Sequence, residues 1–73
     1  MKRWDYTVSE DVEAPDIDIF LRELIQVCRN HNMSITHEDV HGAFIIYRGF
    51  DENSADALLA AHIGASGVDP RSP

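Results

Sequence analysis

The sequence predicts an α+β fold: a three-stranded antiparallel sheet in the spatial order 1-3-2, packed by one main helix, with a short C-terminal helix. Three patterns support this class: a two-residue alternation near the start, a helical apolar stripe in the middle, and two extended runs around a polar loop. A chain of 73 residues holds at most one small domain. We expect that domain to cover residues 1–64 and a flexible tail to cover 65–73, which is small, polar and interrupted by two prolines.

The first strand is predicted over residues 4–8, where Trp4, Tyr6 and Val8 alternate with polar residues. This period of two is typical of a strand with one buried face. We expect the acidic segment that follows to be a solvated loop that leads into the main helix, where negative charge complements the amide dipoles of the first turn.

The main helix is expected to begin at Pro15, because proline suits the first helical position. Apolar residues then recur at intervals of three and four and form one stripe: Ile17, Phe20, Leu21, Leu24 and Cys28. Arg29 places a positive charge in the last turn, where it complements the helix dipole. The helix should end at residues 30–32, because asparagine tolerates the left-handed conformation that follows a final turn.

Two extended runs, residues 33–36 and 43–48, flank the polar segment HEDVHG and predict a β-hairpin. Residues 43–47 are apolar at every position, which is typical of a strand that is covered on both faces. We therefore place the second run in the middle of the sheet, so that every neighbouring pair of strands is antiparallel.

A short second helix is predicted after Gly49. One histidine and several apolar residues recur there at helical spacing: Ala55, Leu58, Leu59, His62 and Ile63. Asn53 and Asp56 are placed like a capping pair, and Gly64 lies past the end.

The composition narrows the class of protein. Thirteen acidic residues against six basic ones give a formal net charge of −7, which opposes direct binding to nucleic acid and favours basic protein surfaces. No stretch is long and apolar enough to span a membrane, and the start lacks the layout of a secretion signal. Cys28 is the only cysteine, which suggests a reduced, buried thiol. We expect a cytoplasmic protein without membrane contact, and we favour a monomer.

The segment THEDVHGAF contains the pattern H-E-x-x-H, formed by His37, Glu38 and His41. In zinc peptidases this pattern lies on a helix, which brings both histidines to one metal while the glutamate activates bound water. His62 is a candidate third ligand. The hairpin interpretation instead places the segment in a loop, where Glu38 and Asp39 are common turn formers. We therefore predict no metal site, no cofactor and no enzymatic activity, and keep a zinc metallopeptidase as the weaker alternative.

Acidic and aromatic side chains are the candidates for protein binding. The segment from Glu10 to Asp18 contains five acids and no base, and its simplest interpretation is a solvated loop before a helix start. Aromatic residues also exceed what one helix can easily cover. The candidate partner-binding residues are Trp4, Tyr6, Glu10, Asp11, Glu13, Asp16, Asp18, Tyr47 and Phe50.

The stretch NMSITHEDVHGAFIIYRGFDEN, which follows a helix ending in VCRNH, resembles a pattern found in small proteins of tailed bacteriophages. This resemblance covers residues 17 to about 59. Through its acidity and length, the whole chain is also similar to small transcription regulators of lytic Xanthomonas phages.

That resemblance implies a phage protein that binds host RNA polymerase in the host cytoplasm, inhibits initiation by disturbing σ-factor attachment, and promotes antitermination. It brings no residue-level motif with it. The residues themselves are compatible with a noncatalytic protein that uses charge to reach a basic surface and aromatic side chains to hold it. The alternative is an acidic nucleic-acid mimic, or an inhibitor of another large host complex.

Overall fold

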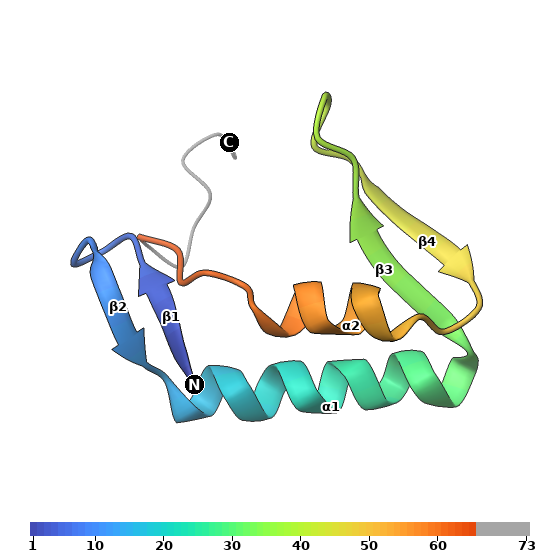
Figure 1. Cartoon of the computed structure of the whole chain (residues 1–73), viewed down its shortest axis with the longest axis horizontal. Helices are drawn as coiled ribbons and strands as arrows, with labels where there is room; N and C mark the ends of the chain where they lie inside the picture. Colours follow the sequence, from blue (N-terminus) through green and yellow to red (C-terminus); the bar gives the residue numbers. More distant parts are fainter. Residues whose placement is uncertain (66–73) are drawn as a thin grey trace, which may run out of the picture.

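A computed structural model describes residues 1–65 of the chain. Its elements, in chain order, are β1 (Lys2–Asp5), β2 (Glu10–Glu13), α1 (Pro15–His31), β3 (Met33–His37), β4 (Phe44–Arg48) and α2 (Glu52–Leu59). The long helix α1 forms the base, α2 lies along it, and a two-stranded hairpin stands at each end of α1 (Figure 1). Apart from residue 65, the expected C-terminal tail lies outside the described residues.

The predicted three-stranded sheet is wrong, because the strands form two separate antiparallel pairs, β1 with β2 and β3 with β4. The first strand stops at Asp5, where the Asp5 carboxylate accepts the N–H of Thr7 at 2.8 Å. This Asx turn bends the chain, and Ser9 adopts a positive φ of 54° before β2 begins. The acidic segment that we expected to be a loop therefore forms a strand of its own.

The prediction that residues 43–48 form a central strand is also wrong, since β4 pairs only with β3 and is the outer strand of its hairpin. The physical reason is the length of α1. Its 17 residues separate the two hairpins by roughly 25 Å, so strands docked at opposite ends of α1 cannot share one sheet (Figure 1).

The boundaries of α1 agree closely with the sequence, whereas α2 ends at Leu59 and does not reach the predicted His62 and Ile63. Pro15 is the first residue of α1, and Asn32 ends it in the left-handed conformation, donating its N–H to the carbonyls of Arg29 and Cys28. The hairpin of β3 and β4 is confirmed as well, with a loop over residues 38–43. The second helix is present, but its N-cap is Asp51, whose carboxylate accepts the Ser54 N–H at 2.9 Å, and not the predicted pair.

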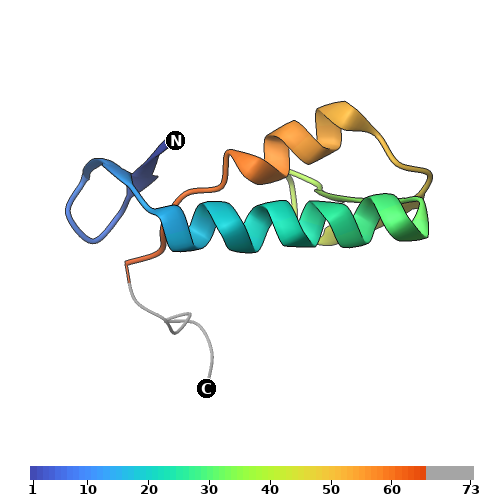
Figure 2. The ribbon, with the colours of Figure 1, turned by 90° about the horizontal axis from the view of Figure 1, so that it is seen from below.

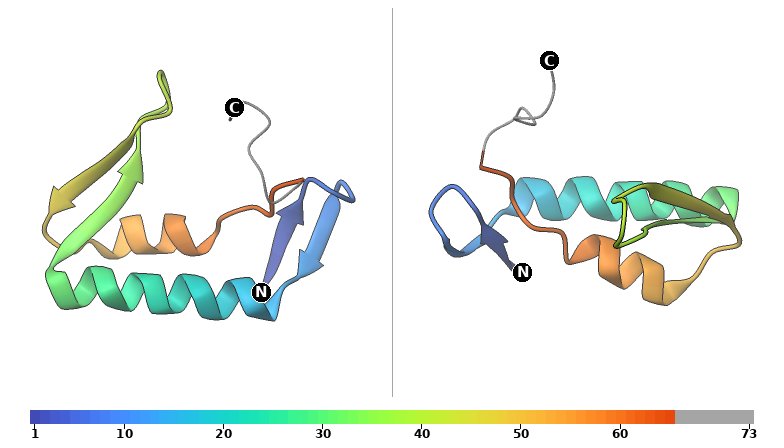
Figure 3. Two further views of the ribbon diagram at one scale, coloured as in Figure 1. Left: turned by 180° about the vertical axis from the view of Figure 1, so that it is seen from behind. Right: turned by 90° about the horizontal axis from the view of Figure 1, so that it is seen from above.

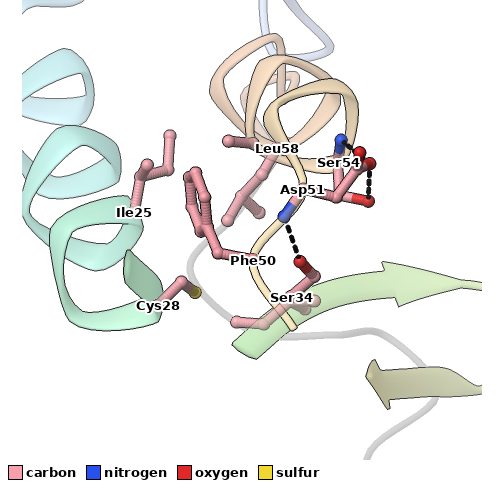
Figure 4. Close-up of a pocket in the computed structure, with 9 residues that line it drawn as sticks. Ile25, Cys28, Ser34, Phe50, Asp51, Ser54 and Leu58 are labelled. Carbon is pink, nitrogen blue, oxygen red and sulfur yellow. Dashed lines mark hydrogen bonds between the residues drawn. The ribbon is translucent and has the colours of Figure 1, made fainter. Parts of the chain in front are cut away.

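The small core lies between the two helices and the start of β3. Leu21, Ile25 and Cys28 of α1 and Ala55 of α2 are buried, and the helices run side by side in opposite directions (Figure 2). Phe50 fills the space between them (Figure 4) and leaves an unfilled volume of only about 10 Å³. None of the helices in residues 1–65 has the length and apolar character needed to cross a membrane.

A buried arginine joins the N-terminal hairpin to both helices. Arg3 is 3% exposed, and its guanidinium donates to the carbonyls of Leu59 at 2.7 Å and Ala61 at 2.9 Å, where α2 ends. It also pairs with the carboxylate of Asp18 in α1, which accepts from the Met1 amino group at 3.0 Å. The Arg3 guanidinium, followed by the Met1 amino group, therefore holds the pKa of Asp18 below its ordinary value.

The segment after α2 extends this attachment along β1. Ile63 donates its N–H to the Trp4 carbonyl at 2.7 Å and accepts the Tyr6 N–H at 3.0 Å. A single parallel bridge between Asp5 and Ile63 results. The hairpin of β1 and β2 is thus held by backbone hydrogen bonds on one side and by Arg3 beneath it.

Ser34 secures the turn between β4 and α2, and its removal should be costly. Its hydroxyl donates to the Gly49 carbonyl at 2.7 Å and accepts the Asp51 N–H at 2.8 Å (Figure 4). Because the Ser34 hydroxyl is buried, Ser34→Ala leaves the Gly49 carbonyl and the Asp51 N–H without their partner, and we expect the free energy of unfolding to fall by about 2 kcal/mol. Urea unfolding followed by circular dichroism measures this loss, and Thr7→Ala, which removes an exposed hydroxyl, serves as the control. Equal midpoints for the two variants would contradict the assigned role.

Candidate protein-binding surfaces

The H-E-x-x-H segment lies on a hairpin and not on a helix. His37 is the last residue of β3, and His41 lies in the loop that follows. The Glu38 carboxylate lies 3.2 Å from His41 Nδ1 and accepts the His41 N–H, so it stabilises the loop. His37 Nδ1 lies 3.7 Å from an Asp39 carboxylate oxygen. The geometry that a zinc peptidase requires, with both histidines on one helical face, is therefore not formed.

The candidate third zinc ligand, His62, lies at the other hairpin. Its Nδ1 is 3.2 Å from the hydroxyl of Tyr6, and the two rings are 5.6 Å apart. The described residues bring together no group of three histidine, cysteine, aspartate or glutamate side chains that could hold a metal ion.

Four of the five clustered acids lie exposed on β2 and at the start of α1. We call this the acidic surface, and its residues are Glu10, Asp11, Glu13 and Asp16. Glu13 lies 3.0 Å from the Met1 amino group, whereas the other three make no ion pair with any residue in the range 1–65. Asp18 is separate from them, because it is buried against Arg3.

Aromatic side chains adjoin the acidic surface on the same hairpin. Trp4 lies opposite Asp11 in the register of β1 and β2, so the two side chains share one face of the hairpin. Trp4 is half-buried and meets Tyr6 edge to face, with ring centroids 6.3 Å apart. Tyr6 is exposed. The hairpin therefore presents carboxylates and an accessible phenol ring next to each other.

The two remaining aromatic candidates lie far from this hairpin. Phe50 packs between the helices (Figure 4). The Arg29 guanidinium lies 4.7 Å from its ring centroid. Tyr47 is exposed on β4, at the opposite end of α1. The structure thus divides the nine candidate residues between the acidic hairpin, the interior and the second hairpin.

A second surface, which is apolar, was missed by sequence reasoning. A groove of about 360 Å³ lies between the second hairpin and α2, and it is lined by Ile35, Thr36, His37, Phe44, Ala57, Leu58 and Ala61. Phe44 and Ile46 of β4 are both exposed. The uninterrupted apolar run AFIIY was the available signal, but it was interpreted as a strand with cover on both faces.

The helix α1 also exposes apolar side chains. Phe20, predicted to lie in the buried stripe, is exposed, and Ile19 and Val27 are exposed as well. The buried face of α1 is narrower than predicted because only α2 and β3 pack against it.

Comparison of the chain with protein-family models found no match, and comparisons with curated proteins and with solved structures found none. The chemistry available at the described surfaces is that of contact: carboxylates and a phenol ring on one hairpin, and apolar side chains with a free strand edge on the other. Both arrangements suit protein recognition.

Proposed function

We propose that this chain is a noncatalytic protein-binding module that docks its acidic surface on a basic surface of a large host complex. RNA polymerase is the partner suggested by the resemblance to phage transcription regulators. The observation that carries the proposal is the set of exposed carboxylates at Glu10, Asp11 and Asp16, which have no ion-pair partner within residues 1–65.

The support is electrostatic and structural. Unpaired exposed carboxylates repel one another, and a positively charged partner relieves that repulsion, so the charge accelerates encounter and selects the partner. The acids are also held in place: β2 pairs with β1 along its whole length, and Arg3 fixes β1 to both helices. A rigid surface loses less entropy on binding than a loop does.

Tyr6 supplies contact area next to these charges. Its ring is exposed, while its hydroxyl is hydrogen-bonded to His62, which limits the movement of the side chain. Ordered tyrosines are frequent in the centres of protein interfaces because they bury a large area at little entropic cost. One hairpin therefore combines carboxylates, which speed the encounter with the partner, and an aromatic ring, which helps to keep the partner bound.

The mechanism that follows is occupation of a surface. A bound module blocks a competing contact, such as σ-factor attachment, and a module that stays bound during elongation can promote antitermination. Occupation requires about one copy for each target, so inhibition should saturate at stoichiometric amounts. Inhibition by amounts far below those of the target would contradict this mechanism.

Charge-matched variants test the acidic surface. The triple variant Glu10→Gln, Asp11→Asn, Asp16→Asn should weaken binding to purified host RNA polymerase by about 10- to 100-fold and reduce its sensitivity to salt. The control carries the same change of charge on exposed acids elsewhere, namely Glu23→Gln, Asp39→Asn and Asp56→Asn. Surface plasmon resonance at low and moderate salt measures both.

Equal weakening by the two triple variants would show that net charge alone matters, and it would contradict a role for this surface. Capture from host lysate followed by mass spectrometry tests the partner separately. Enrichment of another complex without RNA polymerase would contradict the named partner. Displacement of the bound chain by duplex DNA would favour the alternative of a nucleic-acid mimic.

A further inference from the structure

The outer edge of β4 carries backbone hydrogen-bonding groups that have no partner within residues 1–65. Two backbone hydrogen bonds bracket the β3–β4 ladder: the Glu38 N–H donates to the Ala43 carbonyl at 3.0 Å, and the Gly49 N–H donates to the Asn32 carbonyl at 2.6 Å. In an antiparallel ladder, hydrogen-bonded and non-hydrogen-bonded pairs alternate. The register between these two ends therefore makes Ile45 and Tyr47 the residues of β4 that bond to β3.

The other residues of β4 direct their N–H and C=O groups away from β3. These residues are Phe44, Ile46 and Arg48, which occupy the non-hydrogen-bonded positions of the ladder. Among the described helices and strands, only β3 packs against β4, and Figure 3 shows β4 on the outside of its hairpin. An apolar edge strand with unpaired backbone groups is a template for another strand.

We propose that β4 pairs in antiparallel fashion with β4 of a second copy of this chain, so that two hairpins form one four-stranded sheet. From the sequence we favour a monomer, and we place this strand in the middle of a sheet. The structure leaves the strand at an edge, and a second copy supplies the missing neighbour.

The register of this pairing follows from which groups are free. With Ile46 on the two-fold axis, Ile46 faces Ile46 of the second copy and Phe44 faces Arg48 of the second copy. All three outward-pointing residues then meet outward-pointing residues, and about six backbone hydrogen bonds form. A shift by one residue would bring free groups opposite groups that are already bonded to β3.

The side chains fit the same two-fold arrangement. Arg48 is the only charged residue of β4, so the pairing brings no like charges together. Each Arg48 lies beside the Phe44 ring of the other copy, where a cation–π contact can form. On the opposite face of the sheet, Ile45 meets Tyr47 of the second copy. The acidic surface lies at the far end of α1 (Figure 1), so its four carboxylates are kept away from the axis.

The exposed area supports a dimer of modest stability. Val40 is 82% exposed, Phe44 80%, Ile46 58% and Tyr47 56%, which together amounts to an apolar area on the order of 500 Å². This area remains below the 800 Å² or so that each partner buries in a typical stable complex. We therefore expect a dissociation constant on the order of 10 µM.

Sedimentation equilibrium over a range of concentrations tests the association. The wild-type chain should pass from monomer to dimer, and Ile46→Lys, which sets two charges against each other on the axis, should raise the dissociation constant at least about 10-fold. The control is Val27→Lys, which replaces a similarly exposed apolar side chain on α1 with lysine and should leave the dimer intact. A wild-type chain that stays monomeric up to about 1 mM, far above the expected constant, would overturn the proposal.

Cysteine cross-linking tests the register and does not depend on a charged substitution. Directly opposed residues in a hydrogen-bonded pair have Cα atoms about 5.5 Å apart, within the range that a disulfide spans. Ile46→Cys should therefore form a disulfide-linked dimer on mild oxidation, whereas Ile45→Cys, which faces Tyr47 of the other copy, should do so at least about 10-fold more slowly. The wild-type chain, whose cysteine Cys28 is buried, measures the background rate of disulfide formation. Equal rates for the two variants, or capture of an unrelated extended peptide without self-association, would overturn the proposal.

Discussion

Arg3→Ala should lower the free energy of unfolding by about 3–5 kcal/mol. Arg3 is buried and provides the hydrogen bonds for two carbonyls at the end of α2 while it neutralises Asp18. Without the guanidinium, Asp18 keeps only the Met1 amino group and the two carbonyls lose their donor. A domain of this size has only a few kcal/mol of stability, so much of the variant should be unfolded at room temperature, as measured by circular dichroism and urea titration.

Two further variants separate this role from a general effect of charge. Lys2→Ala removes an exposed base from the same strand and should change stability by less than about 0.5 kcal/mol. Adding Asp18→Asn to Arg3→Ala should restore part of the lost stability, because it removes a buried charge left with fewer partners. A double variant no more stable than Arg3→Ala would contradict the pairing.

The ion pair between Arg3 and Asp18 should make the stability of the fold sensitive to acid. The pKa of Asp18 is lower in the folded chain than in the unfolded one. Its contribution to stability is therefore complete above the unfolded pKa and is lost as the pH falls through the folded pKa. Arg3→Ala should flatten this acid limb of the stability profile, whereas Lys2→Ala should retain it.

Phe50→Ala should lower the free energy of unfolding by about 3 kcal/mol, at the lower end for a phenylalanine because the ring is only half-buried. The ring packs between Ile25, Cys28 and Leu58 (Figure 4). The Arg29 guanidinium lies over the ring. Its removal opens a cavity between the two helices that the small core cannot easily close. Thermal and urea unfolding measure the loss.

Tyr47→Ala is the matched control, because it removes another candidate aromatic that is exposed on β4. It should change stability by less than about 0.5 kcal/mol at low protein concentration. If Phe50→Ala left stability unchanged and weakened partner binding instead, Phe50 would be a contact residue and its interior role would be wrong.

Local patterns were enough to predict the helices and the second hairpin. The proline at position 15, the asparagine at position 32 and the apolar repeat between them define α1 almost to the residue. The alternation of residues 33–36 and the turn formers after them define the hairpin. These signals depend on residues that are close together in the sequence, so they do not depend on how the rest of the molecule folds.

The arrangement of strands was not predictable in the same way. The continuous apolar run identified residues 43–47 as a strand that needs packing partners. The sequence does not say whether the residues that pack against it belong to the same chain or to another molecule. The turn after Asp5 depends on one side-chain hydrogen bond to Thr7, which competes with an equally good strand pattern. The role of Arg3 was missed because its three partners, Asp18, Leu59 and Ala61, are separated from it by up to 58 residues.

The attachment of β1 to Leu59, Ala61 and Ile63 has a consequence for biosynthesis. The first hairpin can form early on the ribosome, but the groups that hold it to the helices are made only after nearly all of α2 has been made. Until they emerge, Arg3 lacks two of its acceptors and the end of α2 lacks its donor. Complete folding of the domain should therefore wait for residues 59–63 and occur in one cooperative step, with no stable intermediate formed from the first thirty residues alone.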